Sequence, residues 1–313
     1  FQNSIHIDTA VFFSHGVVQK EIFRSTPYDN ATLEELAKKL LGKNKLPIPD
    51  FANAPIDQIG IYCWHDARLT LELTQFKNNL VMNALIMLSR ICNMDIETLI
   101  HKRISSWIRS YYHFFHRLKN YVIPRAEDLK RFNVGFKGRY KGAIILDPRE
   151  LGTVGAHFDV WGFDFSSLYP SCIDVYNISY DTINCPHEEC KKNKVPETEW
   201  HICTKKRGIL PVIFGTIKNL RVKRFKPELR QKDELLKKLK YEGKSDPELE
   251  NRVAMLWAIV DMLRIVINAG YGVFGDSDLE DLFAYPVAES IAARARNALI
   301  CLLYTSPSPR DRG

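Results

Sequence analysis

Hydrophobic residues recur at helical spacing in the first third of the chain. In the stretch 32–42, Thr32 and Glu35 form a capping-box pattern, apolar residues follow every three or four positions, and Gly42 provides a C-terminal stop. A longer helix is predicted after Pro55, where the apolar positions keep the same period up to Phe76. This part of the chain is therefore predicted to be mostly helical.

The residues 220–268 predict two long helices joined by a short turn. Leucines at helical spacing begin at Leu220, and Gly243 ends the first helix. The sequence Ser245-Asp-Pro-Glu248 is typical of a helix start, with proline at the first helical position. Apolar residues then continue through Leu263. Together these features predict an antiparallel helical hairpin.

Two apolar runs in the middle of the chain predict β-strands. They are Ala143-Ile-Ile-Leu146 and His157-Phe-Asp-Val-Trp-Gly-Phe163, and the second run ends near Asp164. Pro170 would stop this strand because it has no N–H for a ladder. A carboxylate at the end of a buried strand is a common way to hold a metal, and free N–H groups in the following turn would suit a phosphate. Strands combined with helices predict the α+β class.

Composition and charge narrow the choice of partners. The chain has 313 residues, enough for two ordinary domains, with 45% hydrophobic and 26% charged residues. The 44 Lys and Arg against 37 Asp and Glu give a net charge of +7, which fits a polyanionic partner. We expect no membrane span, because no apolar run reaches about 18–20 residues. The seven cysteines lack the spacing of a small secreted domain, so a reducing compartment is expected.

Three of the cysteines lie close together with two histidines. The run Cys185-Pro-His-Glu-Glu-Cys190 is followed by His201 and Cys203. These residues could supply four tetrahedral zinc ligands, but their spacing is not a standard finger pattern. Free thiols in a surface insertion are the alternative, and no zinc is assigned from the sequence.

Two motifs resemble those of one enzyme family. Asp164-Phe-Ser-Ser-Leu-Tyr-Pro-Ser171 resembles the first catalytic motif of the B-family DNA polymerases, Asp-x-x-Ser-Leu-Tyr-Pro-Ser. Arg264-Ile-Val-Ile-Asn-Ala-Gly-Tyr-Gly272 resembles the fingers motif of the same family, Lys-x-x-x-Asn-Ser-x-Tyr-Gly. Here Arg264 replaces the usual lysine, which keeps the charge but loses a readily transferred proton. Ala269 replaces the usual serine.

The resemblance implies template-directed DNA synthesis. A primer 3′-hydroxyl would attack a dNTP, and two Mg²⁺ ions would stabilise the attacking and leaving oxygens. Asp164 and the backbone carbonyl of Phe165 would bind the ions, and the N–H groups of Ser167 and Leu168 would hold the triphosphate. Tyr169 would stack under the sugar.

The fingers motif implies further nucleotide contacts. Arg264 would neutralise the triphosphate, Asn268 would contact phosphate, and Tyr271 would pack beside the nascent base pair. These residues lie at i, i+4 and i+7, on one face of a helix. Gly272 would let the backbone pass close to DNA. Arg221 is the nearest match to the nucleotide-binding arginine of the first hairpin helix, although the lysine usual four residues later is missing.

Two shorter motifs also resemble family motifs. Tyr140-Lys-Gly-Ala143 resembles the linker motif Tyr-x-Gly-Gly/Ala, which implies that Tyr140 and Gly142 contact template DNA; the alternative is a plain β-turn. Tyr62 and Asp66 resemble the third 3′–5′ exonuclease motif, in which the aspartate binds a metal and the tyrosine orients water; the alternative is pairing on a helix surface. The first two exonuclease motifs are not recognisable, so we expect no exonuclease activity from this chain.

The resemblance implies an internal fragment of an archaeal-type B-family replicative polymerase, with the end of an RNase H-like exonuclease domain, a partial palm with an antiparallel sheet and a two-helix fingers hairpin. The expected boundaries are 1–90 for the exonuclease part, 91–139 for a helical linker region, 140–215 and 269–300 for the two parts of the palm, and 216–268 for the fingers. Residues 301–313 resemble the in-frame translation of a transposase-type sequencing adapter and are excluded.

The third polymerase motif of the family carries the second metal-binding carboxylate. It would follow residue 300 and is not recognisable in this sequence, which leaves one carboxylate to hold two Mg²⁺ ions. The chain alone is therefore expected to bind dNTP or DNA weakly and not to polymerise. The resemblance also implies a third alternative for the thiols, because cysteines at about the positions of Cys190 and Cys203 can form a disulfide in heat-adapted members of the family.

Primer–template DNA and dNTP are the expected partners. A sliding clamp could be a further partner, but no clamp-binding segment is visible in the fragment. The expected location is cytoplasmic and nucleoid-associated. A catalytically inactive nucleic-acid-binding module and a protein-primed B-family enzyme are the alternatives.

Overall fold

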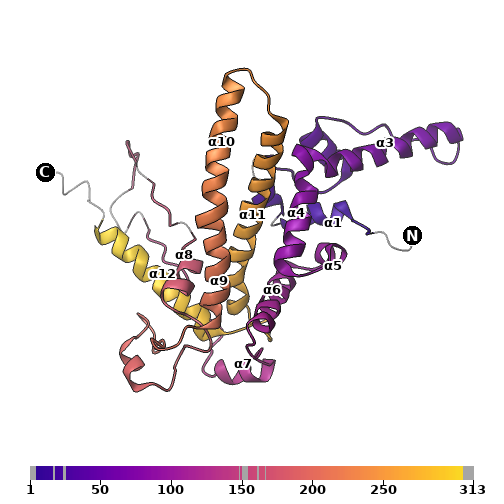
Figure 1. The fold of residues 1–313 in the computed structure, drawn as a ribbon. Coiled ribbons are helices and arrows are strands. Elements are labelled where there is room, and N and C mark those ends of the chain that lie inside the picture. The colour runs from indigo at the N-terminus through magenta and orange to yellow at the C-terminus, as the bar shows by residue number, and fades with distance from the viewer. Residues whose placement is uncertain are drawn as a thin grey trace. The chain divides into compact units, whose positions relative to one another are not determined.

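The computed structural model describes residues 5–16, 18–23, 26–147, 149, 154–160, 162–165 and 167–305, which are predominantly helical (Figure 1). The helices and helical turns, in chain order, are α1 (Thr9–Ser14), η1 (Val18–Ile22), α2 (Leu33–Leu36), η2 (Ala37–Leu41), α3 (Ile56–Thr74), α4 (Phe76–Cys92), α5 (Ile96–His101), α6 (Ile104–Leu118), α7 (Ala126–Phe132), α8 (Leu168–Val175), η3 (Glu188–Lys192), α9 (Ile209–Asn219), η4 (Leu220–Phe225), α10 (Lys226–Tyr241), α11 (Pro247–Gly275) and α12 (Tyr285–Thr305).

The chain divides into two compact units, each made of two segments. The first unit combines Phe1–Phe114 with Leu220–Val266, and the second combines Phe115–Asn219 with Ile267–Gly313. Helix α11 contributes residues to both units.

The predicted helical hairpin is confirmed in the first unit, where α10 and α11 lie side by side (Figure 1). Its apolar seam consists of buried residues from both helices: Leu229, Leu236, Leu249, Val253, Leu256 and Val260. Gly243 adopts a left-handed φ of 70° in the turn, and the Asp246 carboxylate accepts a hydrogen bond of 2.9 Å from the N–H of Leu249. The hairpin is thus held by an apolar seam and a capped second helix.

The predicted ends of the first helical stretch are also confirmed. The Thr32 side chain accepts a hydrogen bond from the N–H of Glu35, and Gly42 ends the stretch with a left-handed φ of 67°. The helix expected after Pro55 is α3. It ends at Thr74, and α4 follows from Phe76.

The second unit packs around α8, which contacts both α9 and α12. The buried side of α12 carries small and branched residues, among them Val287, Ile291 and Ala292. The helix continues through Thr305, while residues 306–313 of the predicted adapter-like tail lie outside the described residues.

The two predicted strands are wrong for the part of the chain that the structure describes. Residues 143–146 are irregular, and so are the described residues before Asp164; the only bridges among described residues are two isolated ones, Ile183 with Ile202 and Lys194 with His201. Ile145 and Phe158 are about nine-tenths exposed, at 91% and 89%. A strand needs a hydrogen-bonded neighbour, and the described residues of these two runs have none. The expected palm sheet and RNase H-like layers are therefore not seen in the part of the chain that the structure describes.

Helix α11 bears on the expectation that no stretch of the chain crosses a membrane. Its 29 residues have the length and the mean hydropathy, 1.7 over 18 residues, of a membrane-crossing helix. However, 61% of that window is buried inside the protein, as in the core helix of a globular domain, so the length and composition are weak evidence for a span.

Candidate functional site

Three predicted site tyrosines meet in the second unit, and we call Tyr140, Tyr169 and Tyr271 the tyrosine cluster. The rings of Tyr169 and Tyr271 are stacked, with centroids 4.3 Å apart and an interplanar angle of 11°. The hydroxyls of Tyr140 and Tyr271 lie 3.4 Å apart. Burial raises the pKa of the Tyr271 hydroxyl well above its ordinary value, so this group stays neutral and available for hydrogen bonding.

A strained turn places Tyr169 in this cluster. Ser167 precedes α8 with φ 61° and ψ 53°, a left-handed conformation that is unfavourable for a residue other than glycine. Its carbonyl accepts a hydrogen bond of 3.0 Å from the N–H of Ser171, which starts the helix. Leu168 is the first residue of α8, so the N–H groups that were predicted to hold phosphate lie in a helix start.

The predicted metal residues precede this turn. Asp164 is exposed and Phe165 is 36% exposed, and both lie in irregular backbone. Among the described residues, no group of three or more His, Cys, Asp or Glu ligand atoms includes Asp164. A site for two Mg²⁺ ions needs several carboxylates, so the described residues alone do not fit such a pair of ions.

Helix α11 carries Arg264, Asn268 and Tyr271, as predicted. The Arg264 guanidinium forms an ion pair with Asp261, with Nη2 and Oδ1 3.1 Å apart, and both side chains are largely buried. Sequence analysis missed Asp261, although its position three residues earlier on the helix is the signal that would have found it. Arg264 is therefore charge-compensated in the structure.

Arg221 belongs to the helical turn η4 and packs against the hairpin helix α11. It is 7% exposed, and its Nε–H donates a hydrogen bond of 3.1 Å to the carbonyl of Val260. This contact joins the helical turn η4 to α11. The position is that of a structural contact, and a role of Arg221 in nucleotide binding stays a prediction.

The linker motif is held by an arginine that sequence analysis missed. Arg296 of α12 is 1% exposed and donates through Nη1 to the carbonyls of Lys141 and Gly142, each at 2.6 Å. Its Nη2 lies 3.1 Å from a carboxylate oxygen of Glu197. No local pattern marks these contacts, because they join residues about 100 or more positions apart.

The predicted exonuclease pair lies on α3 in the first unit. Asp66 forms an ion pair with Lys45 at 2.9 Å, and the Lys45 ammonium lies over the Tyr62 ring at 5.3 Å from its centroid. The other carboxylate oxygen of Asp66, Oδ1, is buried without a hydrogen-bond partner. Among the described residues, no further acidic ligands group with Asp66, so a metal-dependent hydrolytic site is not assembled here.

Comparison with known proteins decides the family. The model of DNA polymerase family B matches residues 96–304, which is more than half of the chain. The chain belongs to DNA polymerase family B. This family B chain is 36% identical to DNA polymerase 1 of Aeropyrum pernix over 96% of its length, and 37% identical to DNA polymerase 1 of Sulfolobus acidocaldarius over 95%.

The family B chain spans about a third of those relatives, 30% and 33% of their lengths. Its fold is similar to the structure of the family B DNA polymerase from the hyperthermophilic archaeon Pyrobaculum calidifontis, with a TM-score of 0.60 and 22% identity. That match covers 87% of this chain and 34% of the other. The resemblance inferred from the motifs is thus confirmed at the level of the family.

Proposed function

We propose that this chain is part of a template-directed DNA polymerase that transfers nucleotides from dNTP to a primer 3′-hydroxyl. The observation that carries the proposal is the tyrosine cluster. It joins the linker motif, the first catalytic motif and the fingers motif in one place, although Tyr140 and Tyr271 are 131 residues apart in sequence. Aromatic side chains are the groups that commonly pack against sugars and bases, which supports the proposal.

Each residue in or near the tyrosine cluster contacts a different part of the nucleotide. Tyr169 packs under the sugar and excludes a 2′-hydroxyl, and Tyr271 packs beside the nascent base pair. The N–H groups of Ser167 and Leu168 bind the triphosphate at the start of α8. Arg264 and Asn268 contact its phosphates, which requires Arg264 to exchange Asp261 for a phosphate.

Asp164 and the Phe165 carbonyl are proposed ligands of Mg²⁺, which would supply charge stabilisation at the reacting phosphate. Because no other carboxylates group with Asp164 among the described residues, no catalytic step is assigned to this chain alone. Tyr62 and Asp66 are proposed as a remnant of a proofreading site. Primer–template DNA, dNTP and a cytoplasmic, nucleoid-associated location are proposals for the whole protein.

Binding of primer–template DNA with and without the matching dNTP tests the proposal, using fluorescence anisotropy on the full chain. We expect Tyr271→Ala to weaken dNTP-dependent binding by roughly fivefold to a hundredfold, since base–aromatic stacking contributes about 1–3 kcal/mol. Tyr271→Phe keeps the ring and should retain most of the binding. Tyr241→Ala, at a site that is 94% exposed, is the matched control.

Equal binding by Tyr271→Ala and the parent chain, with both folded by circular dichroism, would contradict the proposal. A primer-extension assay adds a second readout. The chain alone is expected to give no sustained synthesis, and DNA binding that is indifferent to dNTP would favour a non-catalytic binding module instead.

A further inference from the structure

The segment between α8 and α9 has an unusual interior. Its buried cluster consists of three thiols, those of Cys185, Cys190 and Cys203. The secondary structure within it is limited to the short helical turn η3 and two isolated bridges. Four aliphatic side chains of the segment are buried as well, those of Ile178, Ile183, Val195 and Ile202. A segment with so small an apolar core and so little regular structure needs a further source of stability, and small protein modules of this kind commonly use a bound metal.

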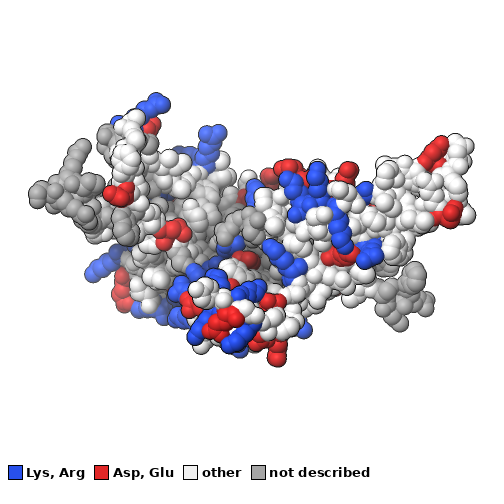
Figure 2. Space-filling view, turned by 90° about the horizontal axis from the view of Figure 1, so that it is seen from above, with Lys and Arg blue, Asp and Glu red and all other residues white. Residues whose placement is uncertain are grey.

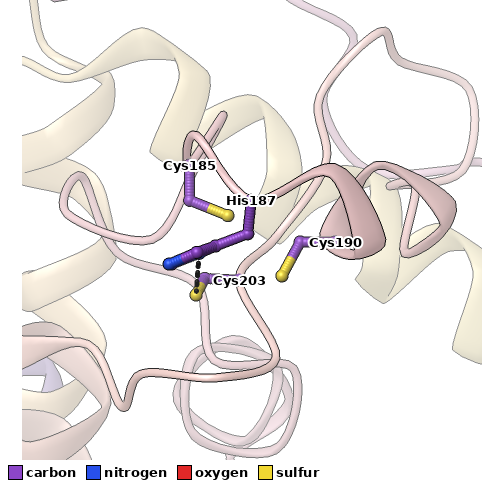
Figure 3. Close-up of side chains that lie close together, drawn as sticks. All are labelled: Cys185, His187, Cys190 and Cys203. Atoms are coloured by element: carbon purple, nitrogen blue, oxygen red, sulfur yellow. Dashed lines mark hydrogen bonds between the residues drawn. The ribbon is translucent and has the colours of Figure 1, made fainter.

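The ligand atoms of four side chains converge in this segment (Figure 3). The three cysteine sulfurs and a ring nitrogen of His187 all lie within 4.8 Å of one another, and the Cys203 sulfur is 3.5 Å from His187 Nδ1. In a tetrahedral zinc site, ligand atoms are separated by about 3.5 Å for sulfur and nitrogen and about 3.8 Å for two sulfurs. The observed spacing leaves room for one such ion.

Neighbouring groups support the ligands. The Cys190 sulfur accepts a hydrogen bond from the backbone N–H of Thr204 at 3.4 Å, and the Thr204 hydroxyl lies at the same distance. The His201 ring lies 3.0 Å from the carbonyl of Cys185 and so braces the first ligand. Donors to a metal-bound sulfur and braces on the ligand backbone are the usual outer contacts of a metal site.

We propose that Cys185, His187, Cys190 and Cys203 bind one structural Zn²⁺ ion. Three soft sulfur ligands and one imidazole form a closed Cys₃His set, which favours zinc in a structural role. A disulfide between Cys190 and Cys203 would use only two of these groups and leave Cys185 and His187 without a function. In the structure all three cysteines are free.

The zinc-bound segment also reaches the predicted DNA contacts. It contains Glu197, which pairs with Arg296, and Arg296 holds the carbonyls of Lys141 and Gly142. It also contains Trp200, whose Nε1–H donates to Glu289 of α12 at 2.5 Å. The ion therefore stabilises the loop that fixes the linker motif, without taking part in chemistry.

The test measures zinc by plasma mass spectrometry in the full chain, purified without chelators. We expect about one zinc per chain, and loss of most of it in Cys190→Ser and in His187→Ala. Cys172→Ser is the matched control, because Cys172 is also buried in the second unit, at 3% exposed, but lies outside the cluster. A chelator should lower the melting temperature of the parent chain and the control.

Two further measurements on the parent chain keep the test decisive if a variant fails to fold. Co²⁺ should give the visible absorption of a tetrahedral thiolate site, and Zn²⁺ should displace it. The intact mass without reductant should show all cysteines as thiols after the metal is removed. A parent chain that stays zinc-free after reconstitution under reducing conditions, or that carries a disulfide within the cluster, would overturn the proposal.

Discussion

Three glycines near the end of α11 differ in what surrounds them. A Cβ at Gly270 would collide with the Phe214 ring, and one at Gly275 would collide with the Tyr140 hydroxyl. A Cβ at Gly272 would meet no protein atom within 4 Å. Close packing therefore requires glycine at Gly270 and Gly275, whereas Gly272 faces open space. The contact of Gly272 with DNA stays a prediction.

Alanine at Gly270 and at Gly272 should have opposite effects on stability. Gly270→Ala is expected to lower the free energy of unfolding by about 1–3 kcal/mol, because the methyl group overpacks against Phe214. Gly272→Ala is expected to raise it by about 0.5–1 kcal/mol, because alanine is the better helix residue. Urea denaturation of both variants measures this, and each serves as the control for the other. Equal effects at both positions would contradict the packing.

The Tyr271 hydroxyl should make stability depend on pH in the alkaline range. Burial raises its pKa above the ordinary value of about 10, so the unfolded chain loses this proton at a lower pH than the folded chain. The stabilisation is complete below pH of about 10 and falls as pH rises further, by up to about 1.4 kcal/mol per pH unit.

Urea denaturation tests this between about pH 9 and 11, roughly one unit on either side of the ordinary tyrosine pKa. Over this range the free energy of unfolding of Tyr271→Phe should decline less steeply than that of the parent chain. Part of the decline should persist, because burial also raises the pKa of Tyr28 and Tyr111. Identical slopes in variant and parent would show that Tyr271 is solvated.

At the scale of elements, local signals predicted the helices well. The capped stretch that ends at Gly42, the helix after Pro55 and the hairpin of α10 and α11 follow from hydrophobic period and cap residues, which act within a few positions. The strands failed because pairing depends on a distant partner. The π-helical turn η4, which buries Arg221 against Val260, also had no local signal.

The hairpin seam should be the main source of its stability. Leu256 is fully buried there, and Leu256→Ala is expected to cost about 2–5 kcal/mol through lost burial and a cavity. Leu235→Ala in the same hairpin is the control; its side chain is 49% exposed, and its effect should stay within about 0.5 kcal/mol. Thermal melting followed by circular dichroism distinguishes them. A similar loss for both variants would mean that the seam is not the packed core.

At the scale of the molecule, the arrangement of charged side chains bears on DNA binding. The net charge is +7, yet Lys and Arg alternate with Asp and Glu on the face in Figure 2. Acidic residues pair with several of the cations on the hairpin, as Glu228 does with Arg252 and Glu250 does with Lys240. A modest number of phosphate contacts is therefore expected, not a long basic track.

DNA affinity should accordingly depend on salt with a moderate slope. With about three phosphate contacts, raising salt from about 50 to 200 mM would weaken binding by roughly fortyfold. Six to ten contacts would weaken it by about a thousandfold or more. Anisotropy titrations at several salt concentrations measure the slope, and the same titrations with Tyr241→Ala control for nonspecific loss. Affinity independent of salt would contradict any phosphate contact by this chain.

The amino-acid order was sufficient for the helices, their caps and the family motifs, because each of these depends on residues within about ten positions of one another. It also placed Arg264, Asn268 and Tyr271 on one helix. Three features could be seen only in the folded structure. They are the tyrosine cluster, the hydrogen bonds of Arg296 to the linker motif, and the convergence of His187 with the three thiols of the Cys185 segment. Each joins segments distant in sequence or turns side chains toward a common point, and such contacts are set by packing, which no local pattern encodes.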